Sequence, residues 1–187
     1  LAMVRGASFI AGLYPGLNRD LLLAGVMIHD LGKIGEFDLD KNGDYTTDGR
    51  LLGHMILGLD LVQAKINERP DFPADLTRLL KHLIISHHGE YEFGSPKKPK
   101  IIEALALYYL DEMDAKLNGI GGFIERHATE DTGWTDYNRL MERFFYQPDL
   151  EELLESSDTS EFEPEAGSRP RRKPDRDPNQ MSFLEDD

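Results

Sequence analysis

His29 and Asp30 are adjacent residues with metal-binding side chains, and they follow an apolar run that includes Val26, Met27 and Ile28. On a helix, adjacent side chains point about 100° apart, so one residue could bind a first metal ion while the other bridges to a second. Imidazole together with carboxylate suits manganese, iron, cobalt or zinc. The expected chemistry is hydrolysis, because one metal ion, or a pair about 3.5–4 Å apart, lowers the pKa of a bound water and clamps a phosphoryl group.

Histidines supply most of the further candidate ligands. Those on, or at the ends of, predicted core helices are His29, His54, His82, His87 and His88. The sixth histidine, His127, lies in a predicted loop and has no evident role. Taken singly, a histidine at a helix end is more often a partner of the helix dipole or a satisfied core group than a ligand. Several of them together, with carboxylates at matching places, favour a metal site.

Asp111 and Asp114 are the carboxylates at matching places. They are three residues apart and therefore share one face of a helix. Leu110 and Met113 beside them predict that this face meets the core. An unpaired carboxylate would be costly there, and a metal ion or a basic partner would remove that cost. The alternative is a pair of solvated aspartates.

Lysines near these residues could contact a phosphate-containing substrate. Lys33 follows the His-Asp pair closely and could neutralise a phosphate oxygen as a point charge. The one basic cluster of the predicted folded part consists of Lys97, Lys98 and Lys100. A lysine-rich loop of this kind is about as often simply exposed to solvent as it is in contact with a ligand. Tyr91 and Phe93 precede the cluster and could stack on a base or pack in the core.

The composition narrows the class of protein. The chain has 187 residues, a net charge of −14 and no cysteine, which excludes thiolate zinc sites and a cysteine nucleophile. Residues 151–187 hold 12 acidic and 5 basic residues, so half of the excess negative charge lies there. The rest of the chain is also acidic, which argues against a broad electrostatic surface for nucleic acid. Since no apolar run is long enough to span a membrane and no signal peptide pattern is present, we expect a cytoplasmic protein without a membrane partner.

Helical spacing of apolar residues predicts six helices, over residues 1–13, 19–31, 49–69, 74–87, 100–118 and 133–146. The helix over 19–31 is almost wholly apolar, which predicts a central position in a bundle. The turn sequence Asp40-Lys-Asn-Gly43 predicts a small hairpin within residues 34–48.

Capping residues give the expected helix ends. Asn18 and Asp48 are the expected N-caps of the helices that follow them. Gly32 is the expected stop of the helix over 19–31, and Gly119, Gly121 and Gly122 should end the helix over 100–118. These elements predict an all-α domain over residues 1–148 with one small hairpin. Residues 149–187 form an acidic tail, which from about residue 158 has few apolar residues and should be mostly disordered.

The motif His29-Asp30-Leu-Gly-Lys33 resembles the signature of the HD-domain metal-dependent phosphohydrolases. Three later segments narrow the resemblance to the YhaM-type 3′-to-5′ exoribonucleases: Gly49-Arg-Leu-Leu-Gly-His54, Ser86-His-His-Gly-Glu-Tyr-Glu-Phe-Gly-Ser-Pro96, and Glu103 through Asn118. The similarity runs from about residue 18 to residue 118. It implies the helical bundle of an HD domain and a phosphodiesterase, dependent on divalent metal ions, that degrades single-stranded RNA or DNA from its 3′ end.

The resemblance also implies roles for the candidate residues. The implied metal ligands are His29, Asp30, His54, His87, His88 and Asp111, with Asp30 bridging two ions. Lys33 would face the phosphate. His82 and Asp114 would lie behind the ligands.

Two features of the family have no counterpart in the chain. The family pattern begins with a histidine ligand on the helix before Tyr14-Pro15, but residues 1–28 contain no histidine. The family also carries an N-terminal OB-type nucleic-acid-binding domain. We therefore expect a fragment whose missing ligand and OB-type domain lie upstream of Leu1, and which binds metal and degrades RNA weakly by itself.

The C-terminus contains a separate motif. Gln180, Met181, Phe183 and Leu184 resemble the short peptide by which bacterial proteins dock on the replicative sliding clamp. A glutamine and apolar anchors on a flexible tether suit that mode of binding. The order Phe-Leu departs from the usual Leu-Phe, and short motifs also arise by chance.

Two other functions remain open from the sequence. One is an HD-domain hydrolase of small or cyclic nucleotides, because a two-metal site does not by itself determine the size of the substrate. The other is a binding module that has lost its metals. The presence of His54, His87, His88 and Asp111 argues against this alternative.

Overall fold

The computed structural model describes residues 1–129 and 131–150. Its elements, in chain order, are the helices α1 (Ala2–Leu13), α2 (Arg19–Ile28) and α3 (Lys33–Glu36), the strands β1 (Phe37–Asp38) and β2 (Asp44–Tyr45), and the helices α4 (Thr47–Asn67), α5 (Ala74–Ser86) and α6 (Ile102–His127). The two strands pair antiparallel, Phe37 with Tyr45 and Asp38 with Asp44. The predicted all-α class with one small hairpin is thus confirmed. No helix within the described ranges is long and apolar enough to cross a membrane.

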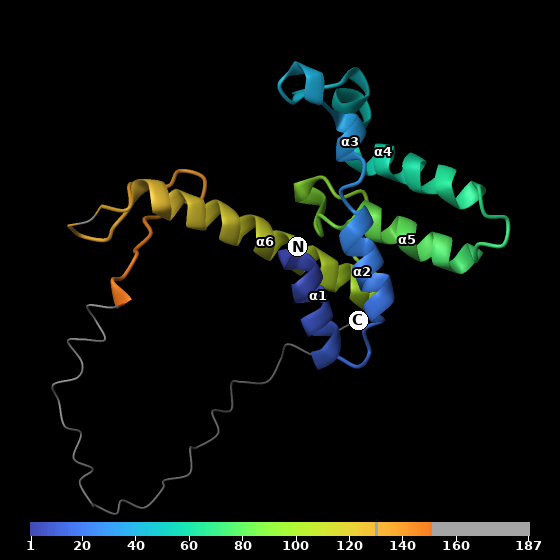
Figure 1. The fold of residues 1–187 in the computed structure, drawn as a ribbon, viewed down its shortest axis with the longest axis horizontal. Helices are drawn as coiled ribbons and strands as arrows, with labels where there is room; N and C mark the ends of the chain where they lie inside the picture. The colour runs from blue at the N-terminus through green and yellow to red at the C-terminus, as the bar shows by residue number, and fades with distance from the viewer. Residues whose placement is uncertain (130, 151–187) are drawn as a thin grey trace, which may run out of the picture. The chain divides into compact units, whose positions relative to one another are not determined.

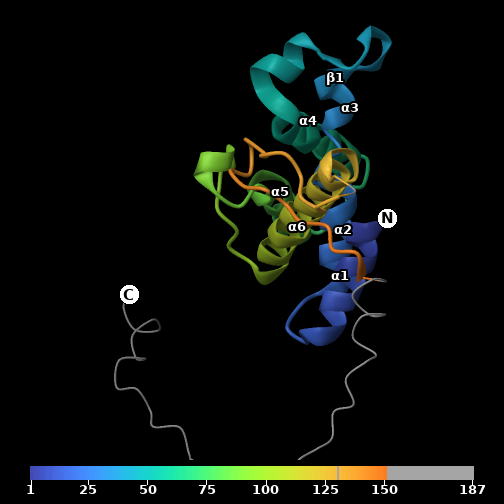
Figure 2. The same cartoon turned by 90° about the vertical axis from the view of Figure 1, so that its left-hand side faces the viewer.

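Two apolar clusters hold the helices together. The larger lies among α1, α2, α5 and α6 and includes the fully buried residues Leu22, Leu83 and Leu107. The smaller joins α4 and α5, which run side by side, around Met55 and Ile84 (Figure 1). Both views show α3 and the hairpin at one end of the molecule, beyond the end of α2 (Figure 2). The clusters bring the ends of α2 and α5 and the middle of α6 together, which is where the candidate ligands lie.

The α2 helix confirms one expectation and corrects two. The Asn18 side chain caps it by accepting a hydrogen bond from the Leu21 N–H at 3.0 Å. The helix is not buried on all sides, because Met27 is 68% exposed. Gly32 does not end it in a left-handed conformation: it has right-handed φ and ψ angles, and a Cβ placed there would overlap the carbonyl oxygen of His54. Gly32 is therefore required for close packing of two backbones.

The α4 helix begins differently from the prediction. Its N-cap is Thr46, whose hydroxyl accepts a hydrogen bond from the Gly49 N–H at 2.8 Å, and Asp48 lies inside the first turn. The helix is interrupted at Gly53, where φ is 75° and ψ is 163°. Only glycine adopts such angles readily. The interruption redirects the chain immediately before His54, a feature that the apolar spacing did not reveal.

The largest difference between prediction and structure is at the C-terminal end of the domain. The α6 helix continues through Gly119, Gly121 and Gly122 to His127, because glycine weakens a helix by about 1 kcal/mol per residue without forbidding it. The segment over 133–146 is extended rather than helical. Trp134 bridges to Tyr146 across it, with ring centroids 5.0 Å apart, as expected of aromatic residues that pair well across strands. The boundary at residue 148 stays a prediction, and the tail with Gln180 to Leu184 lies outside the described residues.

Candidate metal centre

His29, Asp30 and Asp111 form the first of two groups of closely spaced metal-binding side chains, here called the aspartate group. His29 and Asp30 follow the last residue of α2, and Asp111 comes from the middle of α6. The Nε2 atom of His29 lies 3.4 Å from Asp30 Oδ2 and 3.6 Å from Asp111 Oδ1. One donor atom from each residue lies within 4.8 Å of the others, so all three could bind one ion.

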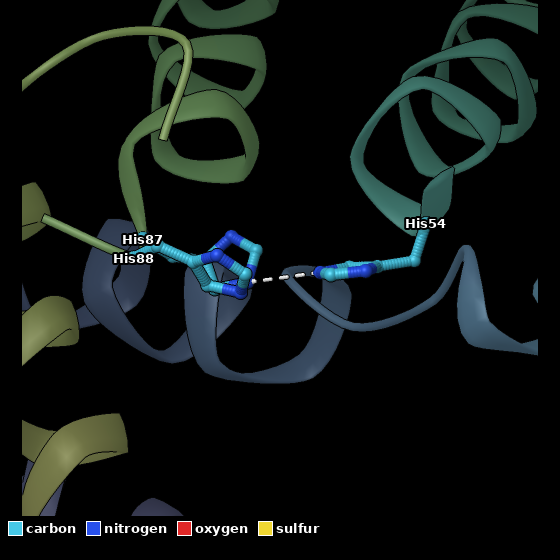
Figure 3. Close-up of side chains that lie close together, drawn as sticks. All are labelled: His54, His87 and His88. Carbon is cyan, nitrogen blue, oxygen red and sulfur yellow. Dashed lines mark hydrogen bonds between the residues drawn. The ribbon is translucent and has the colours of Figure 1, made fainter. Parts of the chain in front are cut away.

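His54, His87 and His88 form the second group, here called the histidine group. His54 follows the interruption of α4, whereas His87 and His88 follow the last residue of α5. The three rings face one another, and the Nε2 atoms of His54 and His87 are 3.4 Å apart (Figure 3). Three converging imidazoles are a ligand set that suits zinc, copper, iron or nickel.

Asp30 belongs to the aspartate group and also lies next to the histidine group. Its Oδ2 atom faces His29 at 3.4 Å. Its Oδ1 atom lies 3.7 Å from Nε2 of His54 and 3.8 Å from Nε2 of His87. One carboxylate oxygen thus faces each group, which is the arrangement required of a residue that bridges two ions.

Main-chain carbonyls orient three of the four imidazoles. The Nδ1 atoms of His29, His87 and His88 lie 3.0, 2.6 and 2.8 Å from the carbonyl oxygens of Val26, Ile84 and Phe93. A carbonyl oxygen can only accept, so each Nδ1 carries a proton and each Nε2 is directed to the centre.

Two buried polar atoms at the centre indicate whether a metal ion could bind there. Within the described residues, Nε2 of His29 and Oδ1 of Asp30 are buried without a hydrogen-bond partner. Buried polar atoms are rarely left unpaired, because desolvation without a partner is costly. A bound divalent metal would remove that cost, so the residues present fit a metal site.

Protonation equilibria agree with this assignment. Burial lowers the pKa of His87 to about 4, and burial also lowers that of His54, so both are neutral, as a metal ligand must be. Burial opposes the charge on His29 as well, but the nearby carboxylates of Asp111 and Asp30 outweigh it and raise its pKa to about 9, so a metal ion bound there would replace a proton. The pKa of Asp30 lies below its ordinary value because His29 and Lys33 outweigh the effect of burial. The aspartate group therefore attracts positive charge to Nε2 of His29.

Comparison with known proteins identifies the fold family. The family model described as "HD domain" matches residues 2–116. The chain belongs to the HD-domain family. No solved structure matches the chain.

The curated relatives of this HD domain include bacterial proteins named "3'-5' exoribonuclease YhaM". The Bacillus subtilis protein is 41% identical over 149 residues, which are 79% of this chain and 46% of that protein. The Listeria innocua protein is 39% identical over 151 residues, 81% of this chain and 48% of its own. The predicted resemblance is confirmed, and the chain spans about half the length of the curated relatives it matches.

Glu36 is a residue of this HD domain that the sequence analysis missed. It is 7% exposed. Its Oε1 atom accepts a hydrogen bond from the His54 main-chain N–H at 3.0 Å and lies 3.4 Å from Nδ1 of the same residue. The carboxylate therefore holds the backbone after the Gly53 interruption and orients the fourth imidazole. A glutamate at the end of a short polar segment has no spacing that predicts such burial, since its partner is 18 residues away.

Lys33 is the one predicted phosphate-binding residue that contacts the centre in the described residues. Its Nζ atom lies 2.7 Å from Oδ2 of Asp30, and its side chain is 48% exposed. The contacts of the lysine cluster lie elsewhere: Lys98 pairs with Glu90 at 2.5 Å and lies over the ring of Tyr91.

His82 and Asp114 also lie outside both groups. His82 accepts the Lys100 N–H at 2.9 Å through Nε2, so it positions the lysine segment. The Asp114 carbonyl accepts a hydrogen bond from the Asn118 side chain at 2.8 Å. His127 stacks on Phe123, with ring centroids 4.4 Å apart, at the end of α6.

Proposed function

We propose that this HD domain is the hydrolytic part of a 3′-to-5′ exoribonuclease that acts on single-stranded RNA. The observation that carries the proposal is the position of Asp30 between two groups of donor atoms. Relatives named "3'-5' exoribonuclease YhaM" support the same reaction and direction.

The proposed roles follow from the geometry. His29, Asp30 and Asp111 would hold one divalent ion, and His54, His87 and His88 the other, with Asp30 shared. Bound there, the ions would supply a water of lowered pKa and stabilise charge on the phosphoryl oxygens. The donor set suits manganese, iron, cobalt or zinc alike.

The protein's own side chains would position the metal ligands and neutralise charge on the phosphate. The imidazoles are oriented by their Nδ1 hydrogen bonds, so the ligand atoms need not reorganise during the reaction. The half-exposed ammonium of Lys33 lies next to the shared carboxylate and would neutralise a non-bridging phosphate oxygen as a point charge.

Further parts of the proposal concern the whole protein. An OB-type domain preceding this chain would bind the single strand. The tail motif with Gln180, Met181, Phe183 and Leu184 would dock on a sliding clamp. Both partners are proposed from sequence resemblance. A place in the cytoplasm is proposed from the hydropathy pattern of the sequence.

The test uses single-stranded RNA labelled at its 5′ end and the protein supplied with Mn²⁺. The wild type should produce a ladder of shortened labelled products. Asp30→Ala should lower the rate more than about 100-fold, because several kcal/mol of charge stabilisation are lost. Asp60→Ala changes an exposed aspartate of α4 and serves as the matched control. Hydrolysis of mononucleotides or cyclic dinucleotides alone would contradict the proposal.

A further inference from the structure

A small cavity opens beside the candidate metal centre. Its volume is about 210 Å³, below the roughly 300–1,000 Å³ of pockets for drug-sized ligands, so it suits one planar ring system. Its lining residues are His87, His88, Phe93, Tyr108, Asp111 and Glu112. The lining thus includes candidate ligands from both groups, and a molecule in the cavity would lie next to the reacting phosphate.

Two aromatic side chains from different elements line the cavity. Phe93 ends the 3₁₀ turn η2 (Tyr91–Phe93), and its carbonyl accepts the Nδ1–H of His88, so the turn is tied to a candidate ligand. Tyr108 lies on α6, and its ring packs directly against Gly89, where any Cβ would overlap it. Gly89 has a φ of 77°, which favours glycine independently. The Tyr108 ring is therefore held against the backbone, whereas Phe93 has a fixed backbone and a ring that is 55% exposed.

Glu112 gives the cavity a polar wall. It lies one turn after Tyr108 on α6, and its carboxylate forms an ion pair with Lys116 at 2.5 Å. Burial and the charge of Glu112 raise the pKa of Tyr108, which agrees with the closeness of the two side chains. With Asp111 and Glu112 both present, the cavity disfavours an anion. The phosphate of a substrate would therefore lie at the metals, and a neutral group with N–H donors would occupy the cavity.

We propose that this cavity binds the base of the 3′-terminal nucleotide, which stacks on Phe93 and Tyr108 and donates a hydrogen bond to Glu112. The inference rests on the proposed function. Bases stack favourably on aromatic side chains whatever their identity. A carboxylate lets the cavity discriminate among the bases, because it accepts a hydrogen bond from the exocyclic amino group of adenine, cytosine or guanine. Uracil has no amino group, and two carbonyl oxygens flank its single N–H, so a 3′-terminal uridine is the poorest substrate.

The experiment compares short RNA strands that differ only in the 3′-terminal nucleotide: adenosine, uridine or an abasic residue. The wild type with Mn²⁺ should show the highest kcat/KM for the adenosine strand. Glu112→Gln should reduce the preference for adenosine over uridine about tenfold, the contribution of one hydrogen bond to a charged group. Phe93→Leu keeps the main-chain bond to His88 and should lower kcat/KM about tenfold on strands that end in a base. It should leave the abasic strand unaffected.

Two exposed residues outside the cavity provide matched controls, Glu125→Gln on α6 for the charge and Phe9→Leu on α1 for the ring. Circular dichroism melting verifies that each variant is folded. Equal preferences in the wild type, Glu112→Gln and Phe93→Leu would overturn the cavity proposal while RNA hydrolysis continued. Failure of the wild type to hydrolyse any of the strands would overturn the proposed function and the cavity proposal together.

Discussion

Each imidazole of the centre is held at one ring nitrogen and presented at the other. Main-chain carbonyls accept from three of them, and the Glu36 carboxylate takes this place for His54. The difference matters because a carboxylate carries charge, raises the basicity of the ligand and can be removed by substitution. His54 is therefore the candidate ligand whose orientation can be tested without substituting a candidate metal-binding side chain.

Glu36→Ala should weaken Mn²⁺ binding by about 10–100-fold, because the His54 ring and the backbone before it lose their shared acceptor. Glu36→Gln keeps an acceptor oxygen and should retain most of the affinity. Isothermal titration with Mn²⁺ measures both dissociation constants. Glu68→Ala removes an exposed carboxylate at the end of α4 and is the control. An unchanged dissociation constant in folded Glu36→Ala would contradict the assigned role.

The elements that carry the centre meet through glycines. Gly32, between α2 and α3, packs against the backbone of His54 and Gly58. Gly53 turns the chain with a φ of 75° just before His54. The distance between the His-Asp pair and His54 is thus set by backbone contact rather than by side chains that could adjust.

Gly32→Ala should destabilise the protein by about 3 kcal/mol or more, because a Cβ there overlaps backbone atoms that cannot rotate away. Urea unfolding followed by circular dichroism measures the loss. Gly12→Ala is the matched control, since Gly12 lies in α1 with open space around it, and it should raise stability by about 0.4–1 kcal/mol. If the two alanine variants unfold at the same urea concentration, close packing at Gly32 is not required.

Two predictions about the helices were wrong for the same reason. The glycines within residues 119–122 predicted a helix end, and the apolar and aromatic residues over 133–146 predicted a helix. Local patterns weigh each residue against its sequence neighbours, whereas α6 keeps helical geometry through its glycines and Trp134 pairs with Tyr146, twelve residues away.

At the scale of the whole described fold, the centre joins four segments. The ligand candidates come from the ends of α2 and α5, the interrupted start of α4 and the middle of α6. Ions bound by these groups would hold together helices that otherwise meet through two separate apolar clusters.

Saturating Mn²⁺ should therefore raise the melting temperature, and EDTA should reverse the rise. Mn²⁺ at a concentration 100-fold above its dissociation constant stabilises the folded state by about 2.7 kcal/mol. This corresponds to a rise in melting temperature of roughly 5–10 °C for a domain of this size. Differential scanning fluorimetry with and without Mn²⁺ measures the shift. The rise should be largely lost in Asp30→Ala, and a full shift in that variant would place the ions elsewhere.

The sequence by itself determined the residue types, the helical class and the family resemblance, because apolar spacing and a motif such as His29-Asp30 are local properties. That motif gave His29 and Asp30 as candidate ligands, and the later segments of the resemblance gave His54, His87, His88 and Asp111. Only the tertiary structure decided that Asp30 lies between two groups, that Glu36 is buried against His54, and that Phe93 and Tyr108 flank one cavity. Those facts depend on contacts between residues 15 or more positions apart, which the packing of helices creates and no local pattern records.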